Sequence, residues 1–227
     1  MTTERANNKY LYIEDLELLS PQKTPKALYI FDIDETLYPS NKIIKMNRFE
    51  ELNCFSDVIG MPKEDRISLY REYEEKYGTV IGGILANYDL TEKDYEILIN
   101  KVENIKVDLI EDALLKNMLS KIEGTMICLT NGEKAYAKEV LSRLGLEELF
   151  EKVICCNYLK KYFLCKPQEE VYEILERFFN ITGKNIYFFD DKRLNLHIPE
   201  KKGWNVYHVT EEKDIKYFLN KLIGLNQ

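Results

Sequence analysis

Histidine, tryptophan and cysteine are scarce in this sequence of 227 residues, which holds two histidines, one tryptophan and five cysteines. The cysteines show neither CxxC spacing nor the Cys/His pairing of zinc sites, so we interpret them as reduced core residues. They are Cys54, Cys128, Cys155, Cys156 and Cys165. No Ser or Cys nucleophile motif accompanies His197 and His208, which we interpret as surface or strand residues rather than catalytic bases.

Long apolar runs are also missing. No stretch of 18 apolar residues occurs, and no apolar segment follows the charges of the first residues, MTTERANNKY. These absences argue against a membrane span and against a Sec-type signal peptide. We therefore expect a soluble protein without a membrane partner, located in the cytoplasm or in the cytoplasm and nucleus.

Positive charge is in deficit, since 32 Lys and Arg residues face 39 Asp and Glu residues and give a formal net charge of −7. Such a chain lacks the excess of Lys and Arg with which proteins bind a phosphate backbone, and this argues against a nucleic-acid polymer as partner. A small anionic ligand in a dedicated pocket stays compatible with this balance. The sequence carries no signature of an oligomeric state.

Five short apolar runs, bounded by polar residues, predict the strands of the core. They span residues 27–31, 126–129, 153–156, 186–189 and 204–209. The runs are continuous rather than alternating, which is typical of strands buried on both faces of a parallel sheet. Segments with helical spacing lie between them, for example Val171, Ile174, Leu175 and Phe178. This order predicts an α/β fold with a Rossmann-like, doubly wound parallel sheet.

One long interval interrupts the alternation of strands and helices. Roughly ninety residues separate the first two predicted strands, whereas a simple crossover needs about a dozen. Residues 42–108 carry helix signals, such as the opening Thr91–Asp94, so we predict an all-helical insertion there. The α/β core then comprises residues 26–41 and 109–227. Residues 1–25 end in Pro21 and Pro25 and predict an N-terminal extension laid on the surface.

Reactive side chains follow four of the predicted strands. Ligands of parallel α/β sheets bind beyond the carboxyl ends of the strands, so these residues are expected to meet at one edge. The set consists of Asp32, Asp34, Thr130, Asn131, Gly132, Lys166, Asp190 and Asp191. Each short motif alone is usually a solvated turn, a helix cap or a helix start. Their joint order, together with the cost of burying unpaired charge, favours a functional site.

Four carboxylates at one edge would repel one another unless a hard cation neutralised them. Magnesium fits, because it takes oxygen ligands and completes its shell with water and substrate phosphate. The hydroxyl of Thr130 and the charge of Lys166 are suited to bind that phosphate. The backbone amides of Asn131 and Gly132, at a helix start, offer it further donors. A carboxylate beside magnesium can attack phosphorus, and Asp34 can serve as the acid and base of the reaction.

The motifs FDIDETLYP, LTNG, KP and FFDD, in this order, resemble the four motifs of the haloacid-dehalogenase-like hydrolases. They span residues 32–195, and the resemblance covers nearly the whole chain except its N-terminal extension. The helical insertion after the first motif resembles the type C1 cap of that family. The stretch EEKYGTVIGGI at 74–84 and the segment LTNGEKAYAKEVLSRLGLEELFE resemble the pyrimidine 5′-nucleotidase group within it.

For the metal and the reacting groups, this resemblance implies distinct roles. Asp32 would be the nucleophile and a metal ligand, and Asp34 would be the acid and base with its backbone carbonyl on the metal. Asp191 would be a magnesium ligand, and Asp190 would bind the metal directly or through water. Asn195 matches the supporting asparagine that follows the pair of aspartates in the fourth motif.

For the phosphate, the resemblance implies that Thr130 and Lys166 bind its oxygens and that Asn131 and Gly132 offer their amides. The implied activity is a Mg²⁺-dependent phosphomonoesterase that hydrolyses a small phosphorylated metabolite through an aspartyl-phosphate. A pyrimidine nucleoside 5′-monophosphate is the substrate that the finer resemblance implies. The alternatives are a sugar-phosphate phosphatase, a phosphomutase, or a binding protein that has lost catalysis.

Some residues depart from the family pattern. A small residue usually follows the two aspartates of the fourth motif, but here Lys192 and Arg193 follow, and Pro199 stands where another small residue is expected. These departures keep the alternative without catalysis open. Tyrosines of the insertion could stack on a nucleotide base, although packing between helices is their more common use. They are Tyr70, Tyr73, Tyr77 and Tyr88.

Overall fold

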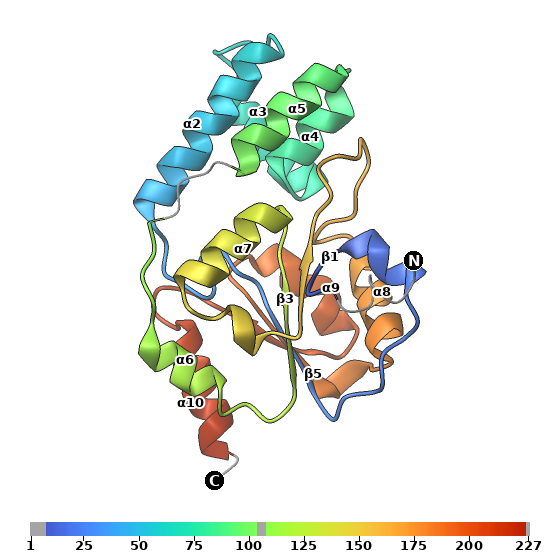
Figure 1. Cartoon of the computed structure of the whole chain (residues 1–227), viewed down its shortest axis with the longest axis vertical. Helices are drawn as coiled ribbons and strands as arrows, with labels where there is room; N and C mark the ends of the chain where they lie inside the picture. Colours follow the sequence, from blue (N-terminus) through green and yellow to red (C-terminus); the bar gives the residue numbers. More distant parts are fainter. Residues whose placement is uncertain (1–7, 104–107, 226–227) are drawn as a thin grey trace.

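The computed structural model describes residues 8–103 and 108–225, which form an α/β core with a group of helices at one end (Figure 1). The core sheet has six strands in the order β1-β4-β3-β2-β5-β6, and every neighbouring pair is parallel. The strands are β1 (Tyr10–Tyr12), β2 (Leu28–Phe31), β3 (Thr125–Leu129), β4 (Lys152–Cys155), β5 (Ile186–Asp190) and β6 (Asn205–His208). The predicted doubly wound parallel sheet is thereby confirmed.

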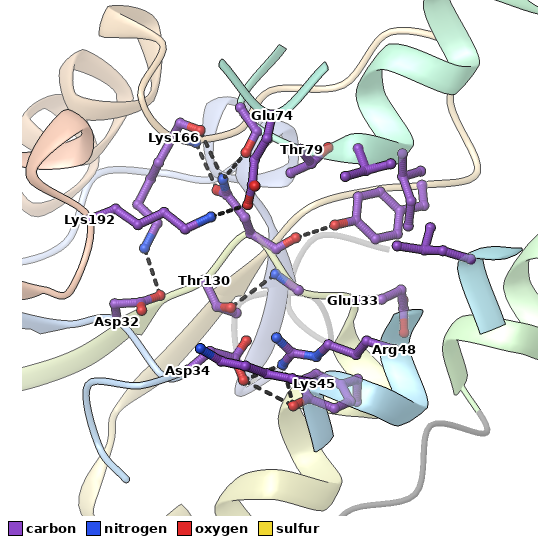
Figure 2. A pocket seen from close by; sticks show the side chains of 18 of the residues that line it. Asp32, Asp34, Lys45, Arg48, Glu74, Thr79, Thr130, Glu133, Lys166 and Lys192 are labelled. Carbon is purple, nitrogen blue, oxygen red and sulfur yellow. Dashed lines mark hydrogen bonds and ion pairs between the residues drawn. The ribbon is translucent and has the colours of Figure 1, made fainter. Parts of the chain in front are cut away.

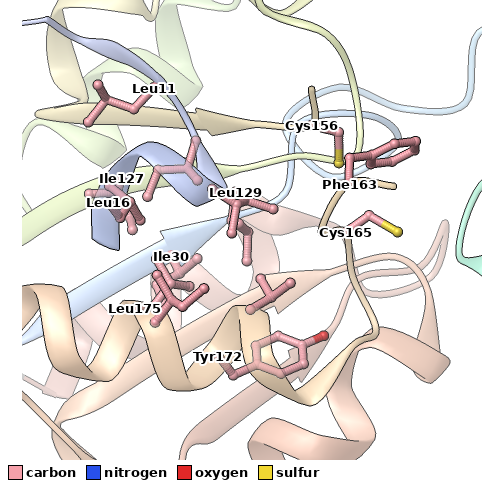
Figure 3. Packing of buried hydrophobic residues seen from close by; sticks show 14 of the residues in the cluster. Leu11, Leu16, Ile30, Ile127, Leu129, Cys156, Phe163, Cys165, Tyr172 and Leu175 are labelled. Carbon is pink, nitrogen blue, oxygen red and sulfur yellow. The ribbon is translucent and has the colours of Figure 1, made fainter. Parts of the chain in front are cut away.

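Helices cover both faces of this sheet because its strands carry apolar side chains on both sides. The helices are α6 (Ala113–Leu119), α7 (Lys134–Arg143), α8 (Glu169–Phe179), α9 (Arg193–Lys201) and α10 (Ile215–Leu225), with the short 3-10 helices η2 (Glu147–Leu149) and η3 (Gly183–Asn185). Leu28 and Ile30 of β2 pack in a cluster with α8 and α9, whereas Tyr29 and Phe31 pack in a second cluster with α6, α7 and α10. Figure 3 shows Tyr172 of α8 on the first of these faces. Each continuous apolar run thus supplies two cores, because successive strand residues point to opposite faces.

The register between β2 and β5 sets the position of the site. Phe31 pairs with Phe189, and their rings stack with centroids 4.8 Å apart. The following residue Asp32 leaves β2 beside Asp190, and the amide of Asp32 donates to the carbonyl of Phe189 at 2.9 Å. β3 pairs with the other side of β2 and ends immediately before Thr130. Residues that are far apart in the sequence therefore meet at the carboxyl edge of the sheet.

The N-terminal segment differs from its prediction as a surface extension. Residues 10–12 form β1, which pairs with β4 at the edge of the sheet, and the 3-10 helix η1 (Ile13–Leu18) follows. Leu11, Ile13 and Leu16 are buried in the cluster that contains α8. A strand of three residues is too short to show a period in the sequence. Residues 10–18 therefore belong to the core rather than to its surface.

Among the described residues, four of the helices between β2 and β3 fall within the range that the sequence predicts as a helical insertion, and α6 follows them. The four are α2 (Lys42–Val58), α3 (Arg66–Tyr77), α4 (Val80–Asn87) and α5 (Glu92–Glu103), and we call residues 42–103 the insertion. It stands over the carboxyl end of the sheet in Figure 1. Tyr70 and Tyr73 are buried inside it, so packing between helices is their role. Residues 104–107 of the predicted range lie outside the described residues.

The cysteines and histidines lie mostly where the sequence predicts them. All five cysteines have free thiols and four are buried, but Cys54 on α2 is exposed, so the expectation that all five are core residues was wrong for this one. His197 is exposed on α9, and His208 ends β6. None of the helices formed by residues 8–103 and 108–225 combines the length and the apolar character needed to cross a membrane.

Candidate active site

A cavity of about 550 Å³ lies between the carboxyl edge of the sheet and the insertion. Figure 2 shows Asp32, Asp34, Thr130 and Lys166 around it. Most of the predicted site residues line this cavity, namely Asp32, Asp34, Thr130, Asn131, Gly132, Lys166, Asp191 and Asn195. Asp190 completes the predicted set and is fully buried, with 0% of its surface exposed. The strand ends therefore gather all of these residues at one place.

Asp32, Asp190 and Asp191 form the acidic cluster of the site. One carboxylate oxygen from each of the three lies within 4.8 Å of the others. Burial raises the pKa of Asp32 well above its usual value, and the charges of Asp190 and Asp191 add to the rise while Lys166 opposes it. Burial and then the charge of Asp190 raise the pKa of Asp191 to about 6. Keeping Asp32 and Asp191 ionised together is therefore costly without a further cation, and the all-oxygen donor set of the cluster fits magnesium.

Lys166 lies at the centre of this cluster. Its ammonium donates to Asp32 Oδ1 at 2.7 Å and to Asp190 Oδ2 at 2.6 Å, and its side chain is 1% exposed. Burial alone would lower the pKa of Lys166, but the charges of Asp190 and Asp32 hold it above its usual value. The lysine therefore stays a cation at neutral pH, next to the carboxylate that the sequence predicts as the nucleophile.

Asp190 is held on both of its carboxylate oxygens by the start of α9. Asn195 Nδ2 donates to Oδ1 at 2.9 Å and to Oδ2 at 3.0 Å, and the amide of Lys192 donates to Oδ1 at 2.8 Å. The hydroxyl of Tyr172 on α8 donates to the carbonyl of Asn195 at 2.7 Å. Asn195 therefore orients Asp190, and Asp190 in turn orients the ammonium of Lys166.

Asp34 receives three donors on one carboxylate oxygen. Tyr38 and Arg48 hydrogen-bond to Oδ1, and Tyr136 donates to the same atom at 2.9 Å. Arg48 comes from α2 of the insertion, and Tyr136 comes from α7 of the core. Burial and the charge of Asp34 raise the pKa of both tyrosines, so they remain protonated donors. These bonds from separate elements fix the position of the carboxylate.

The polar groups of residues 130–132, in the loop after β3, form hydrogen bonds within the protein. The amide of Gly132 donates to Thr130 Oγ1 at 2.9 Å, which differs from the predicted direction toward a phosphate. The side chain of Asn131 bonds to the backbone of Lys166 and of Gly78. Thr130 is buried and lines the cavity. Thr130 thus keeps its predicted place, whereas Asn131 makes contacts that the sequence does not reveal.

Several residues of the site are not identified by the sequence. Tyr38 offers the one clue, because it follows Asp34 by four residues in the same motif. Arg48 and Glu74 reach the cavity from the insertion, and folding alone brings them there. Lys192, which departs from the family pattern, pairs with Glu74 and so joins α3 to the start of α9. The lysine at position 192 therefore has a structural role, because its ion pair connects the insertion to the core.

Carboxylates, a buried lysine and a threonine at the strand ends of a parallel sheet place the chain among α/β proteins with an acidic, metal-type site. The chain belongs to the haloacid dehalogenase-like hydrolases, because the model of that family matches residues 26–193. This interval runs from just before β2 to the start of α9 and contains the acidic cluster, Lys166 and the insertion.

Proteins similar to this chain include a yeast protein and two hydrolases of known structure. "Phosphate metabolism protein 8" of Saccharomyces cerevisiae is 24% identical over 213 residues, which cover 86% of this chain and 66% of the yeast protein. A haloacid dehalogenase-like family hydrolase from Xanthomonas campestris has a TM-score of 0.54 at 14% identity, covering 92% of this chain and 99% of that chain. A HAD family enzyme from Bacteroides thetaiotaomicron, in complex with magnesium and inorganic phosphate, has a TM-score of 0.51 at 17% identity, covering 85% and 98%.

The reach of these similarities differs. The chain spans just under two thirds of the length of the yeast protein, at 66%. The solved structures share 14% and 17% of their residues with this chain, so they establish the fold alone.

Proposed function

We propose that the protein is a Mg²⁺-dependent phosphomonoesterase that hydrolyses a small phosphorylated metabolite through an aspartyl-phosphate on Asp32. The observation that carries this proposal is the contact of Lys166 with Asp32 and Asp190 inside a cluster of three carboxylates. Such a site offers a nucleophile, a cation for the phosphate and oxygen ligands for a metal at one point. Membership of the hydrolase family and the name of the yeast relative support the same activity.

The metal site would use the acidic cluster. Asp32 and Asp191 would hold magnesium through their carboxylates, Asp34 through its backbone carbonyl, and Asp190 directly or through water. Bound there, the metal would neutralise the carboxylates and the phosphate. The bonds of Asp190 to Asn195 and Lys166 support a role in which Asp190 contributes mainly its charge.

The residues of the chain divide the reaction between them. A carboxylate oxygen of Asp32 attacks phosphorus, and the bond from phosphorus to the leaving oxygen breaks. Lys166 and the hydroxyl of Thr130 bind the phosphoryl oxygens and stabilise the charge that spreads over them. Protonated Asp34 gives its proton to the leaving alcohol. Asp34 then accepts a proton from the water that attacks the aspartyl-phosphate, and phosphate and free Asp32 are released.

The insertion would act as a type C1 cap that supplies the pocket for the leaving group. Part of its wall on the cavity is apolar and consists of Leu52, Phe55, Val80, Ile81 and Leu98. The cavity of about 550 Å³ has room for a group of nucleoside size. A pyrimidine nucleoside 5′-monophosphate is therefore our first candidate substrate, and sugar phosphates are the alternative.

The proposal is tested by measuring phosphate release with Mg²⁺ on a panel of nucleotides, sugar phosphates and phosphoglycolate. We expect turnover of at least one of these esters and loss of turnover when Mg²⁺ is chelated. Asp32→Asn should lower kcat by about 10⁴-fold or more, because it removes the nucleophile. Asp89→Asn, at a side chain that is 99% exposed on the insertion, is the matched control. Inertness on the whole panel, or full activity of Asp32→Asn, would refute the proposal.

Two further measurements separate the alternatives. A phosphomutase returns the phosphoryl group to a sugar, so analysis of the products distinguishes transfer from hydrolysis. A protein without catalysis would not form an analogue of the aspartyl-phosphate. Beryllium fluoride with Mg²⁺ should raise the Tm of a working site and leave the Tm of a retired site unchanged.

We further propose a cytoplasmic location, with the nucleus as an additional compartment. The free thiols of the five cysteines support a reducing environment. Fractionation of cells that express the tagged protein tests this location, and enrichment in a secreted fraction would contradict it.

A further inference from the structure

Three segments that are far apart in the sequence meet at the backbone of Lys166. They are residues 77–79 at the end of α3 and in the turn before α4, Asn131 after β3, and residues 165–166 before α8. The thiol of Cys165 donates to the carbonyl of Tyr77 at 3.1 Å, which adds a second contact between the same two segments. The main chain of the buried lysine is therefore in direct contact with the insertion.

The side chain of Asn131 holds both polar groups of the Lys166 main chain. Its Oδ1 accepts from the amide of Lys166 at 2.8 Å, and its Nδ2 donates to the carbonyl of Lys166 at 2.8 Å. The same Nδ2 donates to the carbonyl of Gly78 at 3.3 Å. One amide group thus links the loop after β3, the lysine and the insertion.

Gly78 lets the insertion approach the lysine closely. Its φ is +78°, and a Cβ at this position would lie 2.3 Å from the carbonyl oxygen of Lys166 and 2.9 Å from the sulfur of Cys165. Such contacts are shorter than real Cβ atoms tolerate, so a side chain here would push the turn away from the lysine. The turn and the main chain of Lys166 therefore form one packed unit.

The position of this main chain decides where the ammonium of Lys166 lies. The side chain is 1% exposed and reaches Asp32 and Asp190 at 2.7 Å and 2.6 Å. A buried side chain has little freedom to compensate for a shift of its backbone. Displacements of about 1 Å in a catalytic group can cost about 10²-fold in rate.

We propose that Asn131 is a positioning residue that makes the placement of Lys166 depend on the seating of the insertion turn at Gly78. The proposal deepens the function proposed above, on which the catalytic role of Lys166 rests. A substrate that draws the insertion onto the core thereby places the lysine for reaction, and an unseated insertion leaves the lysine misplaced. The side chain of Asn131 thereby has a role in addition to the backbone amide that the sequence predicts for phosphate.

The first test compares two glycines of the insertion. Gly78→Ala introduces a Cβ against Lys166, whereas Gly60→Ala introduces one at a φ of +70° with nothing within 4 Å. Both variants carry similar backbone strain, so Gly60→Ala is the matched control. We expect Gly78→Ala to lower kcat by about 10- to 100-fold and to speed amide exchange in residues 164–168. Gly60→Ala should leave both quantities within about twofold.

The second test compares two asparagines. Asn131→Asp replaces the donor to Lys166 and Gly78 by an acceptor, whereas Asn157→Asp makes the same change in the loop after β4, where Oδ1 accepts from the amide of Leu159 at 3.2 Å. Asn131→Asp should lower kcat and speed exchange in both residues 76–80 and residues 164–168, and Asn157→Asp should do neither. The double variant with Gly78→Ala should lose no more than about threefold beyond the larger single effect, because both changes act through one link.

Each outcome decides the proposal. It is overturned if Gly78→Ala behaves like Gly60→Ala, if exchange at Lys166 rises while kcat is unchanged, or if the effects of Gly78→Ala and Asn131→Asp multiply. Amide exchange needs no turnover. A wild-type protein that is inert on every ester, but shows the expected exchange, would therefore refute the proposed function while the link between the insertion and Lys166 stands.

Discussion

The carboxylates of the site differ in how the chain pairs them. Lys166 lies between Asp32 and Asp190, and Asp190 is held by Asn195. Asp191 lines the cavity and is half-buried, with its pKa raised to about 6 by burial and by the charge of Asp190. Protonation of Asp191 near this pH therefore links pH to the proposed metal site.

Binding of Mg²⁺ should weaken as the pH falls through about 6. A raised pKa means that Asp191 takes up a proton near pH 6, and the protonated carboxyl group no longer binds the metal. Below that pH, the apparent Kd for Mg²⁺ should rise by up to about tenfold per pH unit for this group. Calorimetric titration with MgCl₂ at acidic and at neutral pH measures the effect. Equal affinity at both would contradict the expected role of Asp191.

The sequence predicts the residues that follow strands and misses those that arrive from other elements. Asp32 and Asp190 could be predicted because each comes directly after a fully apolar run. Arg48 and Tyr136 could not, because a single arginine or tyrosine on a helix has no signal until the helix is placed over the sheet. The direction of the Asn131 side chain also depends on the loop that carries Lys166, more than thirty residues away.

At the scale of elements, α2 connects the insertion to the reacting groups through Arg48. Its guanidinium bonds to Asp34 and to the hydroxyl of Tyr136 and lies over the tyrosine ring, 4.6 Å from its centroid. Burial alone would lower the pKa of Arg48, but the charge of Asp34 holds it above its usual value. Arg48 therefore stays charged at neutral pH, and its contact with Asp34 joins α2 to the core.

Loss of the contact between Arg48 and Asp34 should reduce activity much more than loss of an ion pair at the surface does. Arg48→Met removes the guanidinium that orients Asp34, and we expect kcat/KM to fall by about 10²-fold. Arg143→Met is the matched control on α7, because Arg143 is 57% exposed and its pair with Glu139 is an ordinary surface pair. The control should stay within about twofold of wild type. Steady-state kinetics on the best ester of the panel measures both, and equal effects would contradict the assignment.

β1 and η1 are the elements that the sequence places least well. Leu11→Ala should lower the free energy of unfolding by about 2–4 kcal/mol, because Leu11 is 2% exposed in the core cluster. Leu18→Ala, nearby in η1 at a residue that is 68% exposed, should change it by less than about 0.5 kcal/mol. Denaturant unfolding compares the two variants. Similar small losses in both would mean that residues 10–18 are a surface extension after all.

At the scale of the whole molecule, the division into a sheet and an insertion follows from the spacing of apolar runs. Runs buried on both faces predict the parallel sheet, and the long interval between the first two predicts the inserted helices. The contacts between the two parts, such as Glu74 with Lys192 and Asn131 with Gly78, are absent from any local pattern. They depend on tertiary packing, which the period of a sequence does not encode.

The structure also shows where part of the net charge of −7 lies. Part of it is gathered in the cluster of Asp32, Asp190 and Asp191, beneath the insertion. A chain that is acidic as a whole can therefore bind a phosphate at the point where its own carboxylates and Lys166 combine with a divalent cation. The acidic balance is compatible with a small phosphate ester.

The most direct measurement looks for the covalent intermediate itself. The protein is mixed with Mg²⁺ and its best phosphate ester, quenched in acid during turnover and digested for mass spectrometry. A phosphoryl group on Asp32, dependent on Mg²⁺ and absent from Asp32→Asn, is the predicted result. Turnover with the phosphoryl group on another residue, or undiminished turnover by Asp32→Asn, would contradict the aspartyl-phosphate mechanism.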